Sequence, residues 1–152
     1  MNLQQIWNAT FLRRWHRNQH LADTHDTLAG HQGRVALLLL SYWPDSSAAA
    51  LHYALTHDLP ESGVGDMPGD VKRNYPNLAT EIAKAEAIEA GRLGITWNIT
   101  EREKARADFC DKLDAWLWMQ HHKPELDLTP DWRDARERLQ FMADNLGVEL
   151  PL

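Results

Sequence analysis

The chain has 152 residues, a formal net charge of −6, 43% hydrophobic residues and 25% charged residues. This length suits one compact domain and is short for two, so we expect a single domain over residues 1–152. The acidic balance argues against a nucleic-acid polymer as partner, because such binding needs a basic surface that releases counterions. No apolar run approaches the roughly 20 residues that span a bilayer, so we expect no membrane segment.

The start of the chain and its cysteine content indicate a compartment. Residues 1–15 lack the basic start, apolar block and small-residue cleavage site of a secretory signal. Cys110 is the only cysteine, which excludes a disulfide framework. A cytoplasmic location fits both observations.

Helical patterns dominate the sequence, and the Asn-Gly and Asp-Gly turns typical of hairpins are missing from it. We therefore predict an all-α fold of about six helices. In chain order, helices are expected over residues 3–15, 27–43, about 46–58, 77–90, 100–121 and 129–145, with a short helical piece at 69–74.

Two local signals set boundaries that matter for function. Pro60 disfavours helical geometry at the residue before it, so the third helix should finish near Asp58 and be followed by an ordered loop over 59–68. Thr100 followed by Glu103 is a capping box that begins the helix expected over residues 100–121.

The tripeptide Thr-His-Asp occurs twice, at residues 24–26 and 56–58. Only the second copy has further acids nearby, because Glu61 and Asp66 follow its histidine by four and nine residues, whereas Ala29 lies four residues after the histidine of the first copy. A neutral imidazole beside a carboxylate can bind one divalent cation. The sequence therefore favours His57 and Asp58 as metal ligands.

Two more ligands are needed to complete such a site. His31 is the best third ligand, because the apolar block at 35–40 fixes its helix in the core. Asp111 is the best fourth ligand, since alanines stand one turn away on both sides and let other helices approach. Asp108 and Asp114 lie on nearly the same helix face, so spacing alone does not separate the three acids.

This pattern resembles the HD-domain superfamily of metal-dependent phosphohydrolases, whose ligand order is H…HD…D. Within it, residues 57–72 are similar to the HDxxE and GDxPxxxK motifs of bacterial HD-domain 5′-deoxynucleotidases and phage HD-domain dATP triphosphohydrolases. Residues 14–15 and 107–116 resemble the same group, so the likeness covers about residues 14–118. Register with the family's Ala-Asp-x-Leu-x-Ala pattern favours Asp111 over its two neighbours.

The resemblance implies an HD-domain helical bundle that hydrolyses deoxynucleoside 5′-monophosphates with metal-activated water. The ligand set suits Co, Mn, Fe, Ni or Zn. Glu61 is placed to orient or deprotonate the attacking water, and Asp66 to position water or to protonate the leaving sugar oxygen.

Substrate recognition is expected from three further residues. Arg14 offers a planar fork for phosphate oxygens, Trp15 offers a flat face for a base or sugar, and Lys72 offers a further phosphate contact. The chain departs from the family pattern at Cys110, where alanine is usual, and at Asp108, where lysine is frequent. The acidic residue and serine usual around the first histidine ligand are also replaced, since the chain reads Gly-His-Gln at residues 30–32.

Two other functions remain open at this point. Removal of triphosphate or pyrophosphate from a deoxynucleoside triphosphate would use the same site, and the cationic cluster within residues 13–20 suits it. A metal-bound module that senses nucleotides without turnover is the rival from another class, although the joint presence of Glu61 and Asp66 favours an enzyme. Exposed tryptophans and short terminal helices would suit a homo-oligomer.

Overall fold

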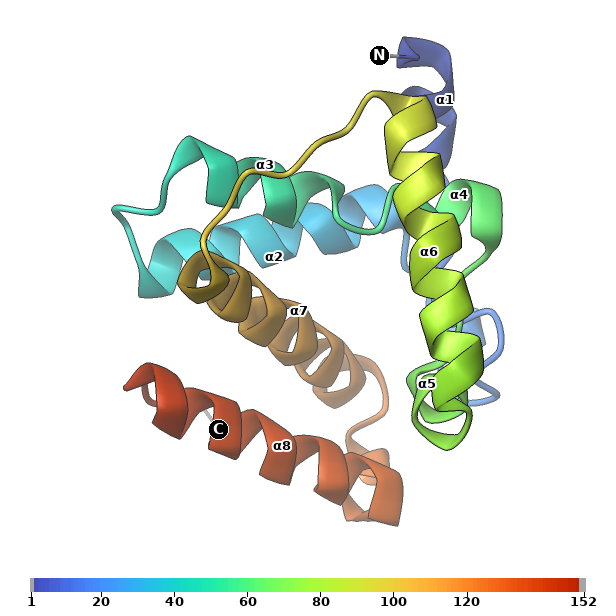
Figure 1. The fold of residues 1–152 in the computed structure, drawn as a ribbon. Helices are drawn as coiled ribbons and strands as arrows, with labels where there is room; N and C mark the ends of the chain where they lie inside the picture. The colour runs from blue at the N-terminus through green and yellow to red at the C-terminus, as the bar shows by residue number, and fades with distance from the viewer. Residues whose placement is uncertain (1, 151–152) are drawn as a thin grey trace. The chain divides into compact units, whose positions relative to one another are not determined.

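The computed structural model describes residues 2–150 and shows the predicted all-α fold (Figure 1). In this range β pairing is limited to an isolated antiparallel bridge between Arg13 and Thr27. None of the helices described has the length and hydropathy of a membrane span. The elements, in chain order, are α1 (Leu3–Ala9), η1 (Ala22–Thr24), α2 (Leu28–Tyr42), α3 (Ala48–Thr56), α4 (Glu61–Val64), α5 (Gly69–Asn74), α6 (Pro76–Leu93), α7 (Glu101–His122), η2 (Pro124–Leu128) and α8 (Pro130–Leu146).

The chain forms two compact units, each discontinuous in sequence. The first unit holds the described residues up to Gly30 together with Thr56–Trp97, and the second unit holds His31–Leu55 together with the described residues from Asn98 onward. The unit boundaries therefore cut the chain at three points, of which one lies within α2 and one before the last residue of α3. The single domain expected from chain length stays a prediction.

The first unit is built around α6, with α4 and α5 packed along it (Figure 1). One cluster of buried apolar residues in this unit draws on five separate stretches, with Ala9, Leu28, Leu59, Ala90, Leu93 and Ile95 as its members. The approach of α4 to α6 is close at Gly63, where an added Cβ would lie 2.5 Å from Cδ of Glu89. The left-handed Gly94 ends α6, as a glycine after a helix commonly does.

The first helix is much shorter than predicted, because it ends at Ala9 instead of continuing to Trp15. The backbone beyond it pairs with a distant segment: Leu28 N–H donates to the Leu12 carbonyl at 2.8 Å, and Arg14 N–H donates to the Asp26 carbonyl at 3.0 Å. These bonds close a loop. The amides of residues 10–12 still donate to the carbonyls of residues 7–9, but the Thr10 and Leu12 carbonyls and the Arg14 amide bond across the loop, so the helix does not continue.

The loop predicted over residues 59–68 contains a helical turn, α4, that the prediction missed. Pro60 precedes it with φ near −60°, a geometry that suits the first turn of a helix and needs no backbone donor. Glu61 then occupies the first helical turn, where a carboxylate is favourable near the positive end of the helix dipole. The two prolines and two glycines of this segment shorten the helix without preventing it.

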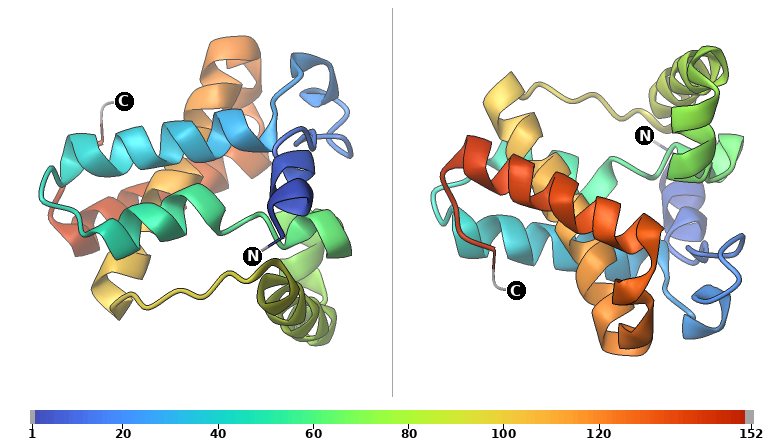
Figure 2. Two further views of the ribbon diagram at one scale, coloured as in Figure 1. Left: turned by 90° about the horizontal axis from the view of Figure 1, so that it is seen from above. Right: turned by 90° about the horizontal axis from the view of Figure 1, so that it is seen from below.

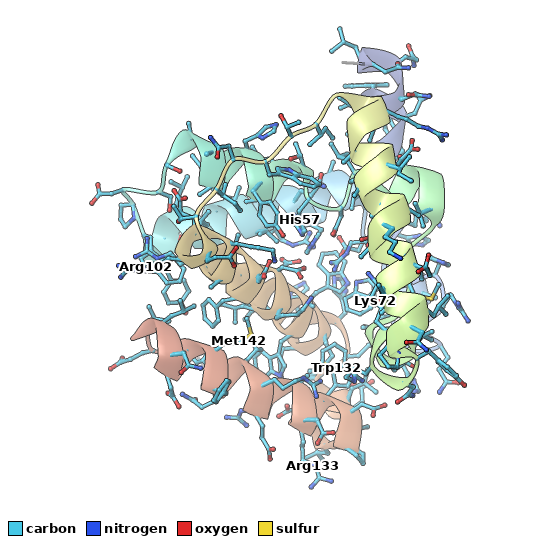
Figure 3. The ribbon with its side chains drawn as sticks, viewed as in Figure 1. His57, Lys72, Arg102, Trp132, Arg133 and Met142 are labelled. Atoms are coloured by element: carbon cyan, nitrogen blue, oxygen red, sulfur yellow. The ribbon has the colours of Figure 1, made fainter. Side chains whose placement is uncertain are left out.

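In the second unit, α7 and α8 lie side by side and η2 joins them (Figure 2). Phe109 of α7 is fully buried and meets the rings of Tyr42 and Trp43 edge-on, with centroids 5.5 Å and 6.2 Å away. Met142 of α8 points toward α7 (Figure 3). The capping box predicted at Thr100 is present, so α7 begins where the sequence indicated.

Candidate functional site

The second Thr-His-Asp copy lies at the C-terminal end of α3, as predicted. Thr56 is the last residue of α3, and its hydroxyl accepts a hydrogen bond from Trp97 Nε1 at 2.9 Å. His57 follows it (Figure 3), with Nε2 3.3 Å from Oδ1 of Asp58. The two side chains are only 11% and 20% exposed, so the pair presents a half-buried imidazole and carboxylate from one short turn.

Glu61 opens α4 directly after this turn, and its environment is unusual for a carboxyl group. Burial, together with the negative charges of Asp58 and Asp66, raises the pKa of Glu61 to about 8 against the partly opposing charge of Lys72. Three carboxyl groups thus crowd one side of the first unit. A cation bound there would offset their mutual repulsion.

Lys72, on α5 (Figure 3), is the cation whose charge acts on Glu61. Its Nζ is 3.3 Å from Oε1 of Glu86 on α6, and both side chains are partly exposed. Lys72, which the sequence proposed as a phosphate-binding residue, is therefore already paired with a carboxylate. Glu86 was not singled out by the sequence analysis, and its position one helix away gives no local signal.

Arg14 and Trp15 lie together in the loop that follows α1. The Arg14 guanidinium stands 5.1 Å from the centroid of the Trp15 ring. Asp26 holds both, because its Oδ2 accepts from Arg14 Nη1 and from Trp15 Nε1, each at 3.2 Å. Trp15 has φ of 63°, a left-handed conformation that is rare for so large a residue. The loop thus fixes a cation and an aromatic face at one place.

The second unit carries its own histidine–aspartate pair. His31, in the first half of α2, is fully buried, and its Nε2 lies 3.2 Å from Oδ1 of Asp111 on α7. Lys112 Nζ lies 2.6 Å from the other oxygen of Asp111. Sequence spacing left three aspartates of α7 as alternatives, and this geometry puts Asp111 at Nε2 of the histidine.

The other two aspartates of α7 differ sharply from each other. Asp108 accepts hydrogen bonds from Tyr53 and from Lys104, at 3.2 Å and 2.6 Å. Asp114 is buried, and its Oδ2 lies 2.7 Å from Nδ1 of His31. Burial acts to raise the pKa of the Asp114 carboxyl, but hydrogen bonds from His31 and Arg34 outweigh it and lower that pKa.

Cys110, next to Asp111, is fully buried. Burial and the neighbouring carboxylate raise the pKa of its thiol to about 12. A thiol in this state does not form the thiolate that nucleophilic catalysis or soft-metal binding requires. The chemistry of this region is therefore that of imidazoles and carboxylates.

Of the four residues that the sequence proposed as ligands, His57 and Asp58 belong to the first unit, and His31 and Asp111 belong to the second. His31, His57, Asp58 and Asp111 are a group that could hold a metal ion. The set of two nitrogen and two oxygen donors suits first-row divalent metals and does not choose among them. Of the remaining histidines, five are exposed and one, His122, is half-buried; the exposed ones are His16, His20, His25, His52 and His121.

Comparison with known proteins gives no independent assignment. No family model matches the chain, and neither a curated protein nor a solved structure matches it.

Proposed function

We propose that this protein is an HD-domain phosphohydrolase that binds one divalent cation and hydrolyses deoxynucleoside 5′-monophosphates to nucleoside and phosphate. The observation that carries this proposal is the half-buried His57–Asp58 turn, followed at once by Glu61 with its raised pKa. Titratable groups with shifted pKa values beside metal-ligand residues are typical of hydrolytic sites.

The ligands in this proposal are His57 and Asp58 from the first unit and His31 and Asp111 from the second. Two imidazoles and two carboxylates leave coordination positions for water and for a phosphoryl oxygen. A bound divalent cation would lower the pKa of water toward about 7 and polarise the phosphoryl group.

Two acids of the first unit have assigned roles. Glu61 is the base that takes a proton from the attacking water, for which it must be ionised. Asp66 positions water or protonates the leaving sugar oxygen. The negative charges of Asp58 and Asp66 beside Glu61 favour a bound proton on Glu61, which suits a group that takes a proton from water.

Arg14, Trp15 and Lys72 bind the nucleotide in this proposal. The guanidinium fork of Arg14 matches two phosphate oxygens, and Trp15 stacks on the base or sugar. The shared hydrogen bonds to Asp26 support a common role for Arg14 and Trp15, since they orient both side chains before substrate arrives. Lys72 adds charge from α5.

A deoxynucleoside triphosphate is the second candidate substrate, with triphosphate or pyrophosphate as the released group. The loop that carries Arg14 also presents four exposed basic or titratable side chains, namely Arg13, His16, Arg17 and His20. These would suit a longer phosphate chain than a monophosphate provides.

The experiment that tests the proposal measures phosphate, pyrophosphate and triphosphate released from deoxynucleoside mono- and triphosphates, with Co, Mn, Zn or a chelator. Chelator-sensitive phosphate from monophosphates is the expected result. Triphosphate release would move the assignment to the second candidate. No release from any substrate, with metal bound to the protein, would overturn the enzyme and favour a nucleotide-sensing module.

A further inference from the structure

The second unit contains a buried polar chain of which the proposed function uses only one member, His31. His31 on α2 contacts Asp114 on α7, and Asp114 in turn contacts Arg34 on α2. The Asp114 side chain is only 4% exposed, and that of His31 is 0% exposed. A buried carboxylate is costly unless it is paired and hydrogen-bonded, so this arrangement has a strong energetic reason to persist.

We propose that Asp114 is a positioning residue that fixes the tautomer and ring orientation of His31, and that Arg34 fixes Asp114 in turn. This inference rests on the proposed metal site and names what orients one of its ligands. Because a carboxylate only accepts, the 2.7 Å contact means that Nδ1 of His31 carries the proton and donates it. Nε2 then keeps its lone pair, on the side where Asp111 lies.

Helix geometry explains how one imidazole meets both carboxylates. Asp111 and Asp114 are three residues apart, so they stand one above the other on the same face of α7. The ring of His31 spans the two, with Nε2 3.2 Å from Oδ1 of Asp111 and Nδ1 2.7 Å from Oδ2 of Asp114. Within one turn, α7 therefore presents Asp111 to the nitrogen that would bind the cation and Asp114 to the nitrogen that carries the proton.

Arg34 explains why Asp114 serves as the orienting group rather than as a ligand. Its Nε donates to Oδ1 of Asp114 at 2.6 Å, and its Nη2 donates to Oδ2 at 3.1 Å. Both oxygens of the carboxylate are thus committed to a two-point contact that only a guanidinium provides. The same guanidinium lies 4.3 Å from the centroid of the Trp118 ring, which restricts its rotation.

The first test needs no variant and no metal. The ¹⁵N shifts of the His31 ring in the metal-free protein report which nitrogen carries the proton. The expected result is a proton on Nδ1, held by Asp114. A proton on Nε2 in the neutral ring would overturn the inference, whatever the enzyme does.

The second test measures the affinity of the protein for Mn²⁺ and Zn²⁺ by titration calorimetry. Asp114→Asn should raise the dissociation constant by about 10- to 100-fold at unchanged stoichiometry. An asparagine has one accepting oxygen in place of two, so it cannot accept from both His31 and Arg34 as the carboxylate does. Asp108→Asn is the matched control on the same helix and should leave affinity within about twofold. Equal affinity of the folded Asp114→Asn variant and the wild type would overturn the inference.

Arg34→Lys is a second variant in case Asp114→Asn does not fold. It keeps the charge but loses the two-point contact, so it should weaken metal binding by roughly tenfold, whereas Arg106→Lys should not. Arg106 is a fair control because it also lies over a tryptophan, 4.9 Å from the ring centroid of Trp43. If the wild type binds no metal, the proposed function fails, and the ring shifts still decide the role of Asp114.

Discussion

The two Thr-His-Asp copies have the same sequence and opposite structures. In the first copy His25 is exposed in a left-handed conformation with φ of 55°, and Asp26 is 1% exposed. In the second copy the histidine and the aspartate are both half-buried at the end of α3. Both copies belong to the first unit, so they differ in the residues that surround them and not in the unit that holds them.

The difference teaches that a motif acquires its chemistry from what supports it. The second copy follows a helix and precedes another, so His57 and Asp58 emerge together beside Glu61. The first copy ends a 3₁₀ turn inside a closed loop, and its aspartate points inward to Arg14 and Trp15. We therefore expect the second copy to act on the metal and the first copy to act on the substrate.

The largest effect should come from Asp58→Asn, which removes a ligand from the second copy. We expect the bound metal to be lost and turnover to fall by about 10³-fold or more, because water without the cation keeps a pKa near 15.7. Metal content after gel filtration and phosphate release measure the two effects. Asp26→Asn is the control from the first copy and should keep its metal; full metal in Asp58→Asn would contradict the ligand assignment.

Glu61→Gln should reduce turnover by about 10²- to 10³-fold while the metal stays bound, since the variant loses the proton acceptor but no ligand. The measurement is single-turnover phosphate release together with metal content. Loss of metal from a folded Glu61→Gln protein would instead show that Glu61 is a metal ligand beside His57 and Asp58.

Glu61 should also make the stability of the metal-free protein depend on pH. The folded chain keeps the Glu61 proton up to a pKa of about 8, whereas an unperturbed glutamate releases it near 4.5. The unfolded state therefore binds fewer protons in this window, and the unfolding free energy should fall by a few kcal/mol, in order of magnitude, as pH rises from about 5 to 8. Urea unfolding at several pH values measures this free energy, and its dependence on pH should be weaker in Glu61→Gln. An equal dependence in the variant and the wild type would show that Glu61 is not its cause.

A smaller effect is expected from Asp26→Asn in the first copy. The variant leaves Arg14 and Trp15 without their shared acceptor, so the dissociation constant for a deoxynucleoside monophosphate should rise about tenfold, or roughly 1.4 kcal/mol. Stability should fall by about 1–3 kcal/mol, since a buried charged hydrogen bond is lost. Binding measured by tryptophan fluorescence tests this, and loss of stability with unchanged nucleotide affinity would reduce Asp26 to a structural residue.

The smallest effect should come from His25→Gly. The side chain is exposed and its backbone conformation is one that glycine adopts freely, so stability should change by less than about 1 kcal/mol. Metal content and turnover should stay within about twofold of the wild type. A loss of metal in this variant, comparable to that of a His57→Gly variant, would abolish the distinction between the two copies.

The sequence by itself determined the all-α class and most of the helix positions. Proline, glycine and capping residues act over a few positions along the chain, so the end of α3, the start of α7 and the short α5 followed from local signals. The same signals placed His57 and Asp58 at a helix end with Glu61 just beyond. That prediction depended on local chemistry alone.

Tertiary structure decided the features that join distant segments. The early end of α1, the capture of Arg14 and Trp15 by Asp26, and the contacts of His31 with Asp111 and Asp114 all involve partners that spacing along the chain does not identify. Helical periodicity put all three aspartates of α7 on nearly one face, and only the packing of α2 against that face assigned each a different neighbour. Packing separates what periodicity makes equivalent, because a side chain's environment is set by the element it meets and not by its own helix.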